Sequence, residues 1–436
     1  MPLVQAAIQI ATQVTWLAVG MGHLPFELLQ MIFGFCLGDF WSNIDRKLYA
    51  IRRRALTQVC GTWRAVMSQS PRLWNSFDSN LNSNCDLIAS ELACCWNVPL
   101  FIRISLGRKG LLSVPELLGA FRQAMPRAQR LTFVVDTPYN NTLTRTIRNI
   151  PLPETLELSI RDVCGAFVSP NPVVLSRTLS KNKLEILRVQ RTWILWNTLP
   201  PCASLRILVI SNVNDYFPDW EDWQALSSSS PNIERMALLE IGCTNVPAIE
   251  RDEALHFPSL IDLRLHFGLD GDTLSDLVNT FKTPRLRKVS IEAHNIERLR
   301  RLRSGGISGA VHLRLSIKEM FLSFSHDLFS FLPALSSLYI QRIEGFVLDA
   351  LSPKRGEAIL CSKLTLVYIE RVAPIVVRGF LSSRASAGAK IATIACSPGF
   401  TTDWGHPDLE WIRTQVKLRE RLIYREPDWL DGMGRV

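Results

Sequence analysis

The sequence lacks the closely spaced cysteines and histidines that mark zinc sites and redox centres. Its ten cysteines include no C-x-x-C pair, and its seven histidines include no H-x-x-x-H pair. Structural zinc sites and thioredoxin-like centres depend on such spacing. We therefore expect no metal site and no disulfide framework, but mostly buried, reduced thiols in a cytoplasmic or nuclear protein.

Motifs of the common enzyme classes are also missing. No phosphate-binding G-x-x-x-x-G-K-S/T is present, and the glycine-rich run from Gly305 to Gly309 does not have the G-x-S-x-G spacing of a nucleophile elbow. A helix end and a turn explain that run better. The sequence therefore predicts a protein that is not an enzyme and that needs no cofactor.

Long hydrophobic runs and concentrated charge are scarce. Residues 1–20 carry no charge, but Gln5, Gln9 and Thr12 interrupt their apolar residues and no basic residue precedes them, so an N-terminal extension is expected there and a membrane signal is not. The net charge of +9 is spread along the chain and favours acidic partners only weakly. The arginines between residues 298 and 303 fit a solvated helix face, so nucleic acid is not an expected partner.

The 436 residues are 47% hydrophobic, which allows a large core and about two to three domains. The most informative segment is 21–77. Pro25 suits the first turn of a helix, and apolar residues recur behind it from Leu28 to Cys36 at helical spacing. A polar stretch from Gly38 to Arg54 separates this helix from a second one, predicted over Leu56 to Met67 and ended before Pro71.

Two short amphipathic helices rarely form a stable domain alone, so their surplus of apolar residues suggests a partner surface. On spacing alone, an ordinary helical cap on the following domain is the better interpretation. The motifs favour the first interpretation. In order, they are Leu24-Pro25-x-Glu27-Leu28-x-x-x-Ile32-Phe33, Leu56-x-x-Val59-Cys60-x-x-Trp63-Arg64-x-Val66 and Ser70-Pro71-Arg72-Leu73-Trp74.

Together these motifs resemble the F-box, and the last one is similar to the form common in fungal F-box proteins. An F-box is a small helical unit that binds a Skp-type adaptor, which in turn binds a cullin. The resemblance implies that five residues meet the adaptor: Leu24, Pro25, Leu28, Ile32 and Phe33. It also implies that Val59, Trp63 and Val66 pack the helices together or extend that contact.

A second pattern fills most of the chain. The motif apolar-x-x-apolar-x-apolar recurs at steps of 21 to 31 residues. Clear copies begin at Leu184, Leu205, Ile233, Leu260, Leu286, Ala310, Leu335 and Leu364, and weaker ones at Ala128, Pro153 and Ile391. The period fits a leucine-rich repeat, in which each copy is a short strand with its fourth and sixth positions inward. The Asn or Cys that usually follows the strand is mostly absent.

Because a single unit cannot bury its own apolar face, the units must stack. The sequence thus predicts an α/β solenoid with a parallel sheet and helices over 128–400, preceded by the F-box, and the whole is similar to F-box/leucine-rich-repeat proteins. A conventional α/β domain with parallel strands is the alternative. Residues 78–127 form a connecting region with a possible first repeat, in which 99–104 reads as a strand. Residues 401–436 form a cap or tail that contains an amphipathic segment, Trp411 to Tyr424.

Two functions stay open for this architecture. The first is the substrate-recognition subunit of a ubiquitin ligase built on a Skp-type adaptor and a cullin. The second is a repeat-based interaction scaffold with no role in degradation. Solenoids commonly bind partners on the concave face of the sheet, where the third, fifth and seventh positions point. Residues predicted there to contact a protein substrate with an acidic or phosphorylated segment are Arg264, Arg314, Tyr339 and Tyr368; a solvated face without a ligand is the alternative.

Overall fold

The computed structural model describes most of the chain. The ranges are 24–38, 45–79, 85–107, 114–136, 152, 154–162, 173–175, 183–213, 218–241, 254–267, 272–295, 299, 302, 304–319, 327–341, 344–354, 356–370, 372–397 and 404–420. The N-terminal extension expected over 1–20 and nearly all of the arginine-rich segment near residue 300 lie outside them. The described residues fall into two compact units, one within Met1–Asn171 and one that takes in Pro172–Ser176 and Leu184–Arg425.

The first unit begins with a group of short helices. They are α2 (Phe26–Leu37), α3 (Asp45–Gln58), α4 (Gly61–Ser68) and the 3-10 turn η1 (Pro71–Leu73). Pro25 immediately precedes α2, as expected, and Pro71 opens η1. The core of this group includes Phe33 and Trp63, whose ring centroids lie 4.8 Å apart.

The single helix predicted over Leu56 to Met67 is wrong, because two helices meet there. Cys60 has an extended backbone and caps α4 by accepting the Trp63 N–H on its Sγ, 3.5 Å away. The stretch read as polar, Gly38 to Arg54, contains most of α3 instead of a linker. The apolar spacing of three and four runs across the break because residues on both helices face one core.

After the helices, the first unit continues as alternating strands and helices. Its strands are β1 (Ser76–Asp78), β2 (Leu100–Gly107), β3 (Ala128–Asp136) and β4 (Glu157–Asp162). Between them lie α5 (Cys85–Ala93), α6 (Val114–Phe121) and η2 (Met125–Arg127). Each strand pairs in parallel with the next one along the chain. The strand expected over 99–104 is therefore present, and the repeat pattern begins at β1.

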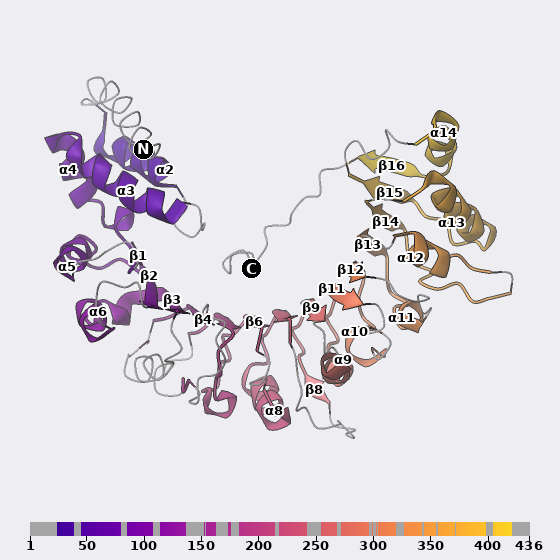
Figure 1. Ribbon diagram of the computed structural model, residues 1–436, viewed down its shortest axis with the longest axis horizontal. Coiled ribbons are helices and arrows are strands. Elements are labelled where there is room, and N and C mark those ends of the chain that lie inside the picture. Colours follow the sequence, from indigo (N-terminus) through magenta and orange to yellow (C-terminus); the bar gives the residue numbers. More distant parts are fainter. Residues whose placement is uncertain are drawn as a thin grey trace. The chain divides into compact units, whose positions relative to one another are not determined.

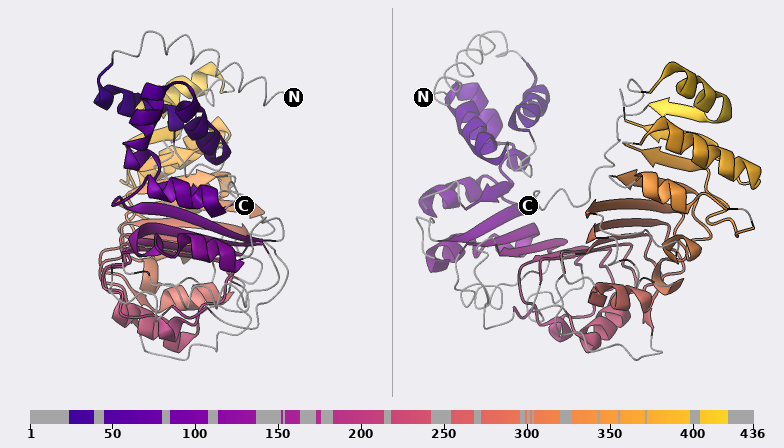
Figure 2. Two further views of the ribbon diagram at one scale, coloured as in Figure 1. Left: turned by 90° about the vertical axis from the view of Figure 1, so that its left-hand side faces the viewer. Right: turned by 45° about the vertical axis from the view of Figure 1, so that its right-hand side comes forward.

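The second unit is a longer version of the same pattern. Its main strands are β5 (Ile186–Gln190), β6 (Ile207–Ser211), β7 (Arg235–Leu239), β9 (Asp262–Phe267), β11 (Lys288–Asn295), β12 (His312–Glu319), β13 (Ser337–Gln341), β14 (Leu366–Ile369), β15 (Thr393–Cys396) and β16 (Lys417–Glu420). They follow one another in chain order and every pairing is parallel. With the four strands of the first unit, this topology confirms the α/β solenoid (Figures 1 and 2).

The helices of the second unit lie on one face of its sheet and leave the other face open (Figure 1). They are η3 (Trp196–Thr198), α8 (Trp220–Ser229), α9 (Asp272–Asn279), α10 (Ser304–Ile307), α11 (Asp327–Ser330), α12 (Glu344–Ala350), α13 (Pro374–Ser386) and α14 (His406–Gln415). A second, two-stranded parallel sheet joins β8 (Leu255–His256) to β10 (Phe281–Lys282). No helix among the described residues is long and apolar enough to cross a membrane.

Local sequence explains several of these boundaries. Asp219 starts α8 with a capping box, in which it and Asp222 each accept the other's backbone N–H. The glycine-rich run from Gly305 to Gly309 contains the end of the short helix α10 and the turn that follows it, as expected. A Cβ at Gly306 would lie 2.0 Å from the Val278 carbonyl oxygen, so only glycine lets α10 pack this closely on α9.

The C-terminal repeat differs from the expected cap. Helix α14 ends at Gln415, and the chain then adds β16 in parallel to β15. The segment from Trp411 to Tyr424 is therefore part helix and part strand as far as Glu420, and residues beyond that lie outside the described part. The repeats thus run past residue 400, to the last described strand.

The inward positions of the second unit form a continuous row. Leu208, Met236, Leu263, Val289, Leu313 and Leu338 face one another from strand to strand, and none is more than 2% exposed. This register is the one that the repeat motif predicts. It means that each apolar side chain is covered by its neighbours on the adjacent strands.

Replacing Leu263 with aspartate is expected to lower the free energy of unfolding by about 3 kcal/mol or more, because an unpaired charge would be buried. Hydrogen exchange should increase first in β7 and β11, the two strands beside it. Ile261→Asp is the matched control, since Ile261 is 39% exposed. Equal effects of the two substitutions would contradict the inward assignment of Leu263.

Candidate functional site

Helix α2 carries two apolar stripes on different sides. Leu29, Phe33 and Leu37 are buried against the other helices. On the opposite side Leu28, Met31 and Phe35 are 41%, 55% and 87% exposed. These three, spaced three and four residues apart, share one helix face and are called the α2 stripe below. A row of large apolar side chains on a short helix is typical of a surface that a partner covers.

The structure places the predicted adaptor residues in two environments. Leu24 and Ile32 are half-buried and Pro25 is exposed, so all three have surface beside Leu28. Phe33 is fully buried in contact with Trp63, so it belongs to the core of the helical group and is not part of the exposed α2 stripe.

The residues predicted on the following helix segment also serve the core. Trp63 and Val66 are both 3% exposed, which fits the helix-packing role that the resemblance offered for them, and Val59 is half-buried. Sequence reasoning missed Met31 and Phe35, although their spacing from Leu28 would have identified them. It also missed Ile51, which is 52% exposed on α3.

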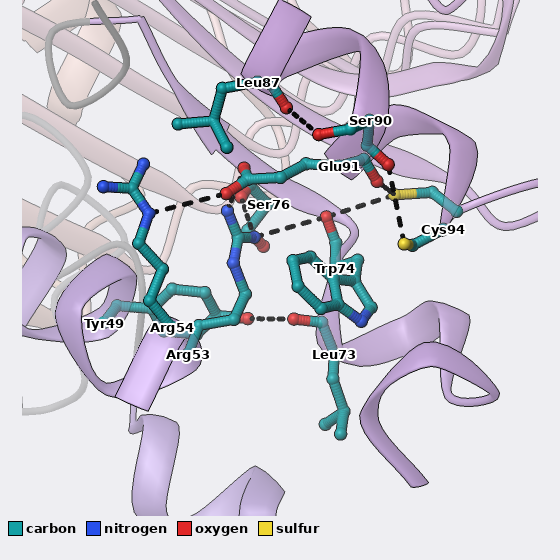
Figure 3. A network of polar contacts seen from close by, with 11 residues as sticks. Tyr49, Arg53, Arg54, Leu73, Trp74, Ser76, Leu87, Ser90, Glu91 and Cys94 are labelled. Atoms are coloured by element: carbon teal, nitrogen blue, oxygen red, sulfur yellow. Dashed lines mark hydrogen bonds and ion pairs between the residues drawn. The ribbon is translucent and has the colours of Figure 1, made fainter. Parts of the chain in front are cut away.

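A buried polar network ties the helical group to the first repeat (Figure 3). Its centre is Arg53 of α3, which is 2% exposed. The Arg53 guanidinium donates to the carbonyl oxygen of Ser76, at 3.1 Å, and to the carboxylate of Glu91. It also lies over the indole of Trp74, 4.9 Å from the ring centroid. One arginine thus contacts β1, α5 and Trp74, the residue after η1.

The rest of the network supports this contact. Glu91 is 3% exposed on α5, and the Nε of Arg54 lies 3.8 Å from its second carboxylate oxygen. Burial raises the pKa of Cys95 to about 12, so its thiol stays protonated and donates to the carbonyl oxygens of Glu91 and Trp74. A buried ion pair is tolerated only with such additional hydrogen bonds. The network therefore fixes α3 on the first strand–helix unit.

On the open face of the second unit, strand pairing aligns the fifth repeat positions in a row. Consecutive members are Arg264, Ser290, Arg314, Tyr339, Tyr368, Ala395 and Arg419. The rings of Tyr339 and Tyr368 stack at 4.4 Å between centroids and 13° between planes. The Arg314 guanidinium lies 4.9 Å from the Tyr339 centroid, which makes a three-layer stack.

Hydrogen bonds hold this stack in place. The Tyr339 hydroxyl donates to the Glu370 carboxylate, and the Tyr368 hydroxyl lies 2.9 Å from the Ser397 hydroxyl. Burial raises the pKa of both phenols, so both stay protonated near neutral pH. Arg314 is exposed, and no ion pair joins it to another described residue. Three of the predicted substrate residues, Arg314, Tyr339 and Tyr368, are thus brought together in one stacked group.

The fourth predicted residue lies in a different charge environment. Arg264 is two strands away from Arg314, and its Nε lies 3.9 Å from an Asp262 carboxylate oxygen. Next to it, the ring nitrogens of His266 lie 3.6 Å from Glu240 and 4.0 Å from Glu292. The part of the open face around Arg264 thus carries both positive and negative side chains. Around Arg314, no ion pair joins the arginine to another described residue.

Comparisons with known proteins add little. No family model matches the chain, and no curated protein matches it. Among solved structures, a chain of the yeast Rad7 and Elc1 complex is similar over 97% of this chain and 98% of its own, with 13% identity and a TM-score of 0.38. A likeness at that TM-score supports no assignment of function.

Proposed function

We propose that this protein is the substrate-recognition subunit of a ubiquitin ligase, in which its F-box-like helices bind a Skp-type adaptor and, through it, a cullin. The observation that carries the proposal is the α2 stripe. It lies on the first helix of the segment whose motifs resemble the F-box, and its apolar side chains are exposed. Covering them with a partner is favourable, because apolar surface is removed from water.

We propose a narrower set of adaptor contacts than the resemblance implies. We assign the contact to the α2 stripe with Leu24, Pro25 and Ile32, which have surface around it. Phe33, Trp63 and Val66 support that surface from the core, and Val59 flanks them. The proposed adaptor contact includes Phe35 of the α2 stripe, so it extends one helical turn beyond Ile32.

The repeats supply the second half of the function. The chain performs no bond chemistry in this proposal; it raises the concentration of a bound substrate beside the ubiquitin carrier of the ligase. The network around Arg53 serves this role, because it fixes α3 to the first repeat. A cytoplasmic or nuclear location fits the proposal, and neither a membrane nor nucleic acid is needed as a partner.

We assign substrate binding to the open face that carries Arg264, Arg314, Tyr339 and Tyr368. The Arg314 side chain is held by a ring that is itself stacked and hydrogen-bonded, so little conformational entropy is lost when it binds a ligand. Arginine pairs well with carboxylate or phosphate groups. An acidic or phosphorylated segment of a substrate therefore fits this surface.

Changing Arg264 and Arg314 together to glutamate is expected to remove the acidic partners that the wild-type protein captures from cells under proteasome inhibition. The control is Arg285→Glu with Arg287→Glu, which makes the same charge change at exposed residues just before β11. Quantitative proteomics of both captures is the measurement. An unchanged partner list for the Arg264/Arg314 variant, with its fold intact, would remove substrate binding from this face.

A further inference from the structure

The open face of β14 and β15 has an apolar patch next to the tyrosine stack. Leu366 is 36% exposed there, although it is large and apolar. Strand pairing sets it beside Thr393 and sets Tyr368 beside Ala395. Leu366, Tyr368 and Thr393 therefore surround Ala395, which is buried, and these four residues are called the β14–β15 patch below.

Within this patch the Tyr368 ring has a fixed orientation and a free face. One face is stacked on Tyr339, which belongs to the strand on one side, and the hydroxyl is held by Ser397. On the other side the neighbour in register is Ala395, whose side chain is a single methyl group. Among the described side chains, only the Tyr339 ring stacks on Tyr368. A further planar group can therefore stack there.

Two cations from β16 border the patch. Lys417 pairs in register with Thr393, and Arg419 pairs with Ala395. Lys417 is exposed and Arg419 half-buried, and no ion pair joins either of them to another described residue. The carboxylate nearest to the stack, Glu370, already accepts the Tyr339 hydroxyl. The border of the patch is therefore positively charged on its β16 side, while Glu370 keeps a negative charge at the Tyr339 side.

The geometry points to a specific ligand for this patch: an extended substrate segment in which an aromatic side chain is flanked by carboxylates. The aromatic ring stacks on Tyr368 above Ala395 and contacts Leu366, and the carboxylates pair with Lys417 and Arg419. A cationic side chain is disfavoured because two like charges border the site. The inference deepens the proposed substrate role, since it names a class of segment for the far end of the same face.

Direct binding to a defined probe tests the inference with the full chain. The probe is a fluorescein-labelled peptide with a central tryptophan and two aspartates on each side, measured by fluorescence anisotropy. Tyr368→Ala should weaken its binding at least about tenfold, since a stacked aromatic pair and its buried area are lost. Ala395→Trp should also block binding, because the new indole occupies the side of the Tyr368 ring that faces away from Tyr339.

Charge is tested separately. Lys417→Glu with Arg419→Glu should weaken binding by a similar factor and reduce its dependence on salt. Lys363→Glu with Lys390→Glu is the matched control, because both lysines are exposed in the turns before β14 and β15. This control should bind the peptide as the wild-type protein does.

The outcomes decide the inference. A peptide with alanine in place of tryptophan that binds equally well would overturn the aromatic contact. No binding to the wild-type protein, or binding that survives both Tyr368→Ala and Ala395→Trp, would overturn the patch as the site. Adaptor binding is measured in a separate assay, so a chain that binds the peptide but not the adaptor would refute the ligase role and keep the patch.

Discussion

Replacing Leu28 and Phe35 with aspartate is expected to abolish binding to a Skp-type adaptor while the repeats stay folded. Both side chains are exposed on α2, so the substitutions remove contact surface and place two charges in the interface. Truncating a central apolar anchor typically costs about 2 kcal/mol or more, roughly thirtyfold in affinity, and two such changes together should exceed a hundredfold. Isothermal titration calorimetry with purified adaptor measures the loss.

Two other substitutions distinguish the loss of contact surface on α2 from the loss of packing in the helical core. Trp96→Asp is the matched control, because Trp96 is 64% exposed in the same unit but lies after α5. It should leave the affinity unchanged. Phe33→Ala should instead lower the free energy of unfolding by about 3 kcal/mol or more, since it opens a cavity beside Trp63. Full affinity in the Leu28/Phe35 variant would show that the α2 stripe is not the adaptor site.

Replacing Arg53 with methionine is expected to destabilise the attachment of α3 to the first repeat by about 3–5 kcal/mol. The change removes the Arg53 guanidinium from the buried carboxylate of Glu91, while the Nε of Arg54 stays 3.8 Å from the other carboxylate oxygen. Hydrogen exchange followed by mass spectrometry over α3, β1 and α5 measures the effect locally, because it reports on opening of these elements.

The double variant Arg53→Met with Glu91→Leu distinguishes the ion pair from general packing. Replacing both partners by apolar residues of similar volume should restore much of the protection, because no unpaired charge remains. Arg72→Met is the control on the exposed side of η1 and should change stability by less than about 0.5 kcal/mol. No loss of protection in Arg53→Met alone would mean that apolar packing, not this network, fixes α3.

The repeat architecture could be predicted from the sequence because every copy uses the same local rule. Positions four and six of each copy are apolar, and β-strands alternate their faces, so the inward row from Leu208 to Leu338 follows directly. The open-face row that contains Arg314, Tyr339 and Tyr368 follows from the same alternation. The stacking of the Tyr339 and Tyr368 rings could not be predicted in this way. It depends on the pairing register of two strands that lie about 30 residues apart in the chain.

Helix α3 was missed because an arginine, Arg53, occupies its buried side between Tyr49 and Leu56. Arg53 is buried there through its contacts with Glu91, 38 positions later, and with the Trp74 ring. Local periodicity treats such an arginine as a solvated residue. The roles of Phe33 and Phe35 were separated only by structure, since a motif aligns residues by position and does not say which side of a helix the neighbouring elements cover.

The most direct test of the central claim is whether the wild-type chain and a Skp-type adaptor form a complex. Co-expressed and purified together, they should elute from a size-exclusion column as a single stoichiometric species, and this species should then bind the cullin. Elution of the chain apart from the adaptor, with its repeats folded, would contradict the account. A complex with the adaptor that recruits no cullin would leave an interaction scaffold in place of a ligase subunit.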